Sequence, residues 1–78
     1  MWWYIEKLSD ENGKIIYSYG YESYDQTGKV EYNQSLNECK VIKPADGDGG
    51  YGLKRFLGHL KRVITSENAP AKRMIATG

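Results

Sequence analysis

The feature that most constrains the fold is the only long amphipathic helix that the sequence predicts, at about residues 53–66. Apolar side chains recur there at the i, i+3, i+4 and i+7 spacing of one buried helical face, namely Leu53, Phe56, Leu57, Leu60, Val63 and Ile64. The opposite side is basic and carries Lys54, Arg55, His59, Lys61 and Arg62. A helix of this kind needs an apolar surface to cover, and the rest of the chain must supply it.

The first half of the chain supplies that surface as a predicted antiparallel sheet. Asn12-Gly13 lies between two runs rich in aromatic and branched residues. It is a strong hairpin signal, because both residues tolerate the positive φ of a type I′ turn. Glu11 opposite Lys14 then sets a regular ladder between the runs at residues 2–8 and 14–22, with residues 9–13 supplying the turn.

A second turn at residues 25–28, a third strand over 29–33 and a fourth over 38–43 extend this sheet. We expect Tyr24 to lie opposite Lys29, and therefore Tyr21 opposite Tyr32. The face expected beneath the helix carries Trp2, Tyr4, Leu8, Tyr17, Tyr19, Tyr21, Val30 and Tyr32, completed by Cys39 and Val41. We favour a core role for its tyrosines over a platform that stacks nucleic-acid bases.

The regular ladder leaves three large apolar side chains on the other, uncovered face of the sheet: Trp3, Ile5 and Ile16. Apolar side chains grouped on an uncovered face are typical of a partner surface. We therefore expect this face to bind a protein, and a second copy of the chain is the favoured partner.

After the helix, a short apolar segment at about residues 73–76 predicts a fifth strand at an edge of the sheet. The fold class is therefore α+β: an antiparallel β-meander of three to four strands, one amphipathic helix packed on one face, and a short C-terminal edge strand, in the order ββββαβ. With 78 residues, the chain is expected to form a single domain, 1–78.

A glycine-rich loop, Asp46-Gly47-Asp48-Gly49-Gly50-Tyr51-Gly52, leads into the helix. It lacks the Gly-Lys-Ser/Thr of a phosphate-binding P-loop, and a calcium loop would need a glutamate where Leu57 stands. We favour a loop that only turns the chain at Gly47–Gly52; contact with an anion or phosphate is the alternative, and a metal site is less favoured.

Charge is divided between the two halves of the chain. Residues 1–50 hold five lysines against nine acids, whereas residues 51–78 hold six bases against one acid. The favoured interpretation is attraction between an acidic sheet and a basic helix within one fold or one dimer. The alternative is that the basic helix, together with Lys72 and Arg73, contacts phosphate.

Candidates for catalysis are few. His59 is the only histidine, which excludes a multi-histidine metal site, and it is most simply a solvated helix residue; phosphate binding or acid–base work is the alternative. Cys39 is the only cysteine and cannot form an internal disulfide, and on the core side of a strand it would be inert. We expect no enzyme, no cofactor and no metal site.

The sequence contains no apolar run long enough for a membrane span, and we expect a cytoplasmic protein. The resulting functional hypothesis is a small non-enzymatic interaction module that self-associates through the open face of its sheet. The alternative is a nucleic-acid- or nucleotide-binding module that uses the basic helix face. None of these patterns identifies a protein family.

Overall fold

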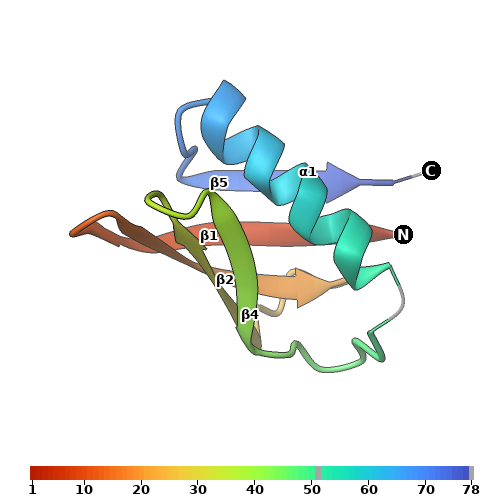
Figure 1. Ribbon diagram of the computed structural model, residues 1–78. Coiled ribbons are helices and arrows are strands. Elements are labelled where there is room, and N and C mark those ends of the chain that lie inside the picture. Colours follow the sequence, from red (N-terminus) through yellow and green to blue (C-terminus); the bar gives the residue numbers. More distant parts are fainter. Residues whose placement is uncertain (51, 78) are drawn as a thin grey trace.

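The computed structural model describes residues 1–50 and 52–77 and has the expected order of elements, ββββαβ (Figure 1). They are β1 (Trp2–Glu11), β2 (Lys14–Tyr21), β3 (Gly28–Asn33), β4 (Glu38–Lys43), α1 (Leu53–Ser66) and β5 (Lys72–Ala76). The strands form one antiparallel sheet in the order β4-β3-β2-β1-β5. The predicted α+β fold is confirmed, including the C-terminal edge strand.

The first hairpin closes as the Asn12-Gly13 signal predicts, because both residues have positive φ, 56° and 76°, and Glu11 pairs with Lys14. The ladder then departs from the predicted register at a β-bulge. Ser9 pairs with Ile16, but the next pair is Lys7 with Tyr17, which leaves Leu8 as an extra residue. Beyond Leu8 every residue of β1 is shifted by one position against β2.

This one-residue shift reverses the two faces of β1, because successive side chains of a strand point to opposite faces. Trp3 and Ile5 lie beneath the helix and are completely buried, each 0% exposed. The prediction that they form a partner surface is therefore wrong. Trp2 and Tyr4, which were expected in the core, lie on the open face, and Leu8 is exposed.

The charge of Glu6 gives a physical reason for the bulge. The regular ladder would place Glu6 opposite Tyr19 on the covered face, where an unpaired carboxylate is strongly destabilising. With the bulge Glu6 lies on the open face and forms an ion pair with Lys72, at 3.8 Å between Nζ and Oε1. Ile5 takes the position opposite Tyr19 instead.

The register between β2 and β3 also differs from the prediction, but without changing the faces. Tyr32 pairs with Ile15 rather than with Tyr21. This shift is six residues along β2, an even number, and therefore Tyr17, Tyr19 and Tyr32 still face the helix. The predicted turn at residues 25–28 is replaced by a longer connection, 22–27, with Gly28 already in β3.

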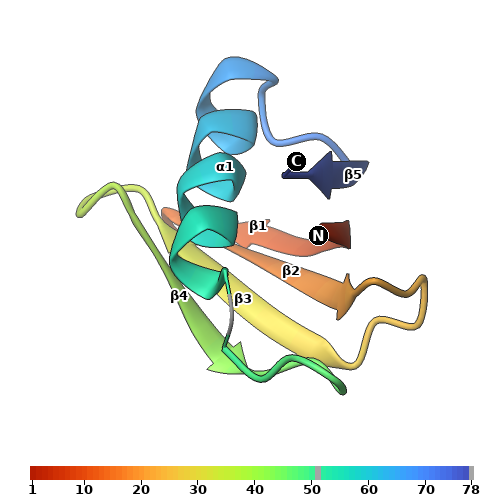
Figure 2. The same ribbon diagram turned by 90° about the vertical axis from the view of Figure 1, so that its right-hand side faces the viewer.

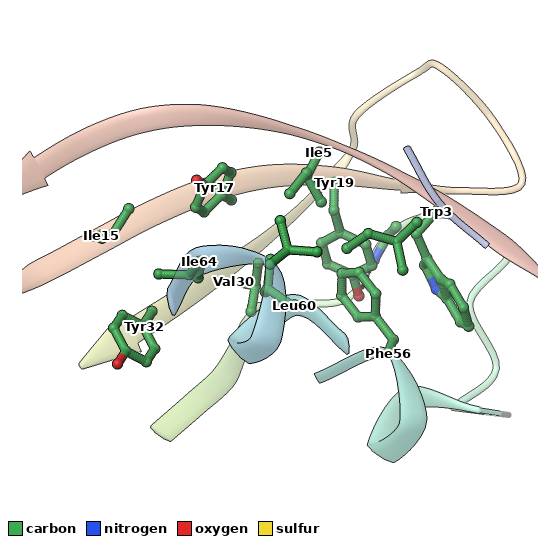
Figure 3. Close-up of a cluster of buried hydrophobic side chains, with 13 residues drawn as sticks. Trp3, Ile5, Ile15, Tyr17, Tyr19, Val30, Tyr32, Phe56, Leu60 and Ile64 are labelled. Atoms are coloured by element: carbon green, nitrogen blue, oxygen red, sulfur yellow. Dashed lines mark hydrogen bonds between the residues drawn. The ribbon is translucent and has the colours of Figure 1, made fainter. Parts of the chain in front are cut away.

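Helix α1 buries the face that its periodicity predicts. Phe56, Leu60, Val63 and Ile64 are buried against the sheet. The Phe56 ring stacks between those of Trp3 and Tyr19, with centroids 4.9 Å and 5.1 Å away (Figure 3). Such aromatic contacts add to the stabilisation that burial alone provides.

The sheet curves round the helix, which contacts both edge strands, β4 and β5 (Figure 2). Only one face of the sheet is covered in this way. The other face, here called the open face, is covered by no helix of the described residues. It is there and on the outer side of α1 that side chains remain available to a partner.

Candidate interaction surfaces

An aromatic patch occupies the open face where β1 and β5 pair. We use this name for Trp2, Tyr4, Tyr24 and Met74. Tyr4 pairs with Met74 across the two strands, and the Tyr24 ring lies 5.3 Å from Trp2 and 5.0 Å from Tyr4 between centroids. Tyr24 is 66% exposed and Met74 is 47% exposed. The patch therefore offers large apolar side chains to the outside.

Tyr24 reaches the patch because the 22–27 connection folds back over the open face. Glu22 begins the connection with a positive φ of 49°. The backbone then passes so close to Gly20 that a Cβ there would lie 2.3 Å from the carbonyl oxygen of Ser23. The Ser18 hydroxyl donates to Oε1 of Gln26 and holds the same connection down.

Sequence reasoning missed Tyr24 and Met74 as surface residues. Two features of the sequence could have indicated the surface. Glu6 cannot lie unpaired on the covered face, and the absence of a side chain at Gly20 leaves room for another segment of backbone to pass over the strand. Of the three residues predicted for the partner surface, only Ile16 belongs to the open face, because its neighbours Ile15 and Tyr17 are buried on the other side.

The other half of the open face is charged rather than apolar. Glu31 lies between two lysines, with Oε1 3.8 Å from Nζ of Lys14 and Oε2 3.6 Å from Nζ of Lys40. The Glu31 side chain is only 12% exposed. These groups line a hollow of about 100 Å³ together with Asn33, Leu36 and Glu38. Ile16 pairs with Glu31 at the margin of this region.

The basic face of α1 forms a second candidate surface, as its periodicity predicts. Lys54, Arg55 and Arg62 are exposed, and His59 and Lys61 are partly exposed. The helix contains no acidic residue. No ion pair found among residues 1–50 and 52–77 involves these five side chains.

The glycine-rich loop is anchored to the core by hydrogen bonds. Oδ2 of Asp48 accepts from the Tyr19 hydroxyl at 2.9 Å, and Oδ1 of Asp48 accepts from the Gly50 N–H at 2.9 Å. The Tyr19 oxygen in turn accepts from the Ala45 N–H at 3.1 Å. Asp48 is therefore committed to contacts within the chain, which favours the structural interpretation of this loop. Tyr51 lies outside the described residues.

Cys39 lies on the core side of β4 and packs against the buried cluster. Burial raises the pKa of its thiol to about 11, against the opposing effect of the nearby Lys61 ammonium. At neutral pH the thiol is therefore protonated, as expected of a structural cysteine. In the described part of the chain, no group of three His, Cys, Asp or Glu side chains is arranged to hold a metal ion.

Comparison with known proteins does not assign this chain to a family. No family model matches the sequence, and no curated protein and no solved structure is significantly similar to it. Within residues 1–50 and 52–77, no helix has both the length and the apolar character needed to span a membrane.

Proposed function

We propose that this chain is a small non-enzymatic interaction module that self-associates through the open face of its sheet. The observation that carries the proposal is the aromatic patch. Trp2, Tyr4, Tyr24 and Met74 gather on a face that no helix of the described chain covers. Exposed apolar side chains gathered in this way are typical of interaction surfaces, and Trp, Tyr and Met are enriched there.

The charges on the same face support a second copy as the partner. Cations and carboxylates alternate there: Lys72 beside Glu6, and Lys14 and Lys40 on either side of Glu31. In a two-fold dimer the same surface faces itself, and each charge must find its opposite on an identical surface. A face with both signs meets this condition, whereas a face of one sign would repel its copy.

Tyr24 and Met74 are the residues to remove, because both are exposed and neither belongs to the buried cluster. The double variant Tyr24→Ser with Met74→Ser should remain folded and become monomeric. Central aromatic contacts carry much of the energy of an interface, so weakening of at least about tenfold in the dissociation constant is expected.

The matched control is Ile42→Ser, which removes a 52% exposed apolar side chain from β4, away from the aromatic patch. Sedimentation equilibrium of the wild type, the double variant and the control decides the proposal. We expect dimer, monomer and dimer respectively. A wild type that stays monomeric at high micromolar concentration, or a double variant that dimerises as well as the control, would overturn it.

A further inference from the structure

Gly58 has no packing reason to be glycine. It lies in the middle of α1, on its exposed side. A Cβ built there would meet no atom within 4 Å. Since glycine in a helix interior is less stable than alanine, the fold gains nothing from it at this position. Close approach of another molecule to the backbone is one use of glycine that packing within the chain does not explain.

Four cationic side chains surround Gly58. Lys54 and Arg55 precede it by four and three positions, and Lys61 and Arg62 follow it by three and four. Residues three and four apart are neighbours on a helix surface, so these side chains border the bare backbone at Gly58 on both sides. No ion pair within the described residues neutralises any of the four.

We propose that Gly58 and these four cations form a docking site for the phosphodiester backbone of single-stranded nucleic acid. The missing side chain lets a phosphate approach the helix surface, and the cations on either side bind it and its neighbours along the strand. Positive charge of this kind, with no acid on the helix, complements a polyanion. The site is separate from the aromatic patch and does not depend on self-association.

The surroundings of Gly58 favour a nucleic-acid backbone over other anionic partners. None of the large exposed apolar side chains of the described residues lies on α1, so the helix offers nothing to insert into a bilayer. On α1 the ring of Phe56 is buried in the core, and the imidazole of His59 is the one ring of this helix that is left to stack a base. Binding should therefore follow phosphate rather than sequence, with a strong dependence on salt.

The test separates stability from binding at a single position. Gly58→Ala and Gly58→Gln both introduce better helix formers into open space, and the melting temperature should rise by about 4 °C. The same variants should weaken binding of a fluorescein-labelled oligothymidine, measured by anisotropy, because a side chain now separates phosphate from the helix. The longer glutamine should weaken it more, on the order of tenfold.

Ser66→Ala is the matched control, because it changes an exposed residue of the same helix that lies eight positions, about two turns, beyond Gly58. It should leave binding unchanged. Arg62→Gln should lower the slope of log affinity against log salt by about 0.7, the contribution of one phosphate on a single strand. Phosphatidylserine vesicles and inorganic phosphate serve as competing probes.

Wild-type binding to oligothymidine that is unaffected by Gly58→Gln would overturn the proposal, as would an absence of binding at low salt. Binding to the vesicles but not to the oligonucleotide would also overturn it and assign the site to lipid. The Tyr24→Ser and Met74→Ser double variant should bind oligothymidine as the wild type does. Failure of the aromatic-patch dimer and failure of this site are therefore observed separately.

Discussion

Both faces of the sheet carry large aromatic side chains on β1, but the two faces differ in what covers them. Adjacent residues show this most clearly: Trp3 is 0% exposed beneath α1, whereas Trp2 lies on the open face and packs against the exposed Tyr24. Burial of a large apolar side chain on the covered face contributes on the order of 2 kcal/mol to stability. On the open face, large apolar side chains of this kind remain available for binding a partner.

The largest effect should come from replacing Trp3, and its neighbour Trp2 provides the comparison. Trp3→Ala removes a ring stacked on Phe56 in the core and should lower the free energy of unfolding by about 3–5 kcal/mol. Trp2→Ala should lower it by only about 1 kcal/mol, since its main loss is one partly exposed aromatic contact. Urea unfolding measures both. Equal losses would contradict the division between the two faces.

Alkaline pH should destabilise the covered face. Burial, with a smaller contribution from Asp10, raises the pKa of Tyr17 to about 12, and burial raises that of Tyr19 to about 12. Unfolded tyrosine titrates near 10. The stability of the fold that depends on keeping the Tyr17 and Tyr19 hydroxyls protonated is therefore fully present below pH ~10, and it is lost as pH rises towards ~12. Urea unfolding across this range should show the decline, and Tyr17→Phe should reduce it.

A smaller effect should follow from closing the space at Gly20. A Cβ in Gly20→Ala would meet the carbonyl oxygens of Ser23 and Asp25 at 2.3 Å and 2.5 Å. The 22–27 connection must move away, at a loss of about 1–3 kcal/mol. Because the connection carries Tyr24, dimerisation should weaken as well. Sedimentation and urea unfolding of the same variant test both effects, and an unchanged dimer would remove Tyr24 from the interface.

The smallest effect should come from deleting Leu8. The deletion joins Lys7 directly to Ser9, whose partners Tyr17 and Ile16 are already adjacent on β2. A regular ladder then keeps Trp3 beneath the helix without a bulge. Since Leu8 is 54% exposed, we expect a change in stability below about 1 kcal/mol. In a Trp2→Phe background, the fluorescence of Trp3 should remain that of a buried ring; a signal typical of an exposed ring would show that the faces had reversed.

The basic helix face was predictable in full, because helical periodicity is local. The spacing of Phe56, Leu60 and Ile64 fixes which side of α1 is buried and thus places Lys54 and Arg62 outside. The aromatic patch was not predictable by the same means. Its members come from β1, β5 and a connection, and no local period relates them.

The sequence by itself determined the helix, the order of the strands, the turn at Asn12-Gly13 and the covered face of β2 and β3. These depend on local periods and turn chemistry, and an even shift in register leaves them unchanged. Only the tertiary structure decided which side of β1 is buried. The two possible registers bury different side chains of β1 beneath the helix. The register that buries Trp3 and Ile5 gives the more stable fold, because the other register would bury the carboxylate of Glu6.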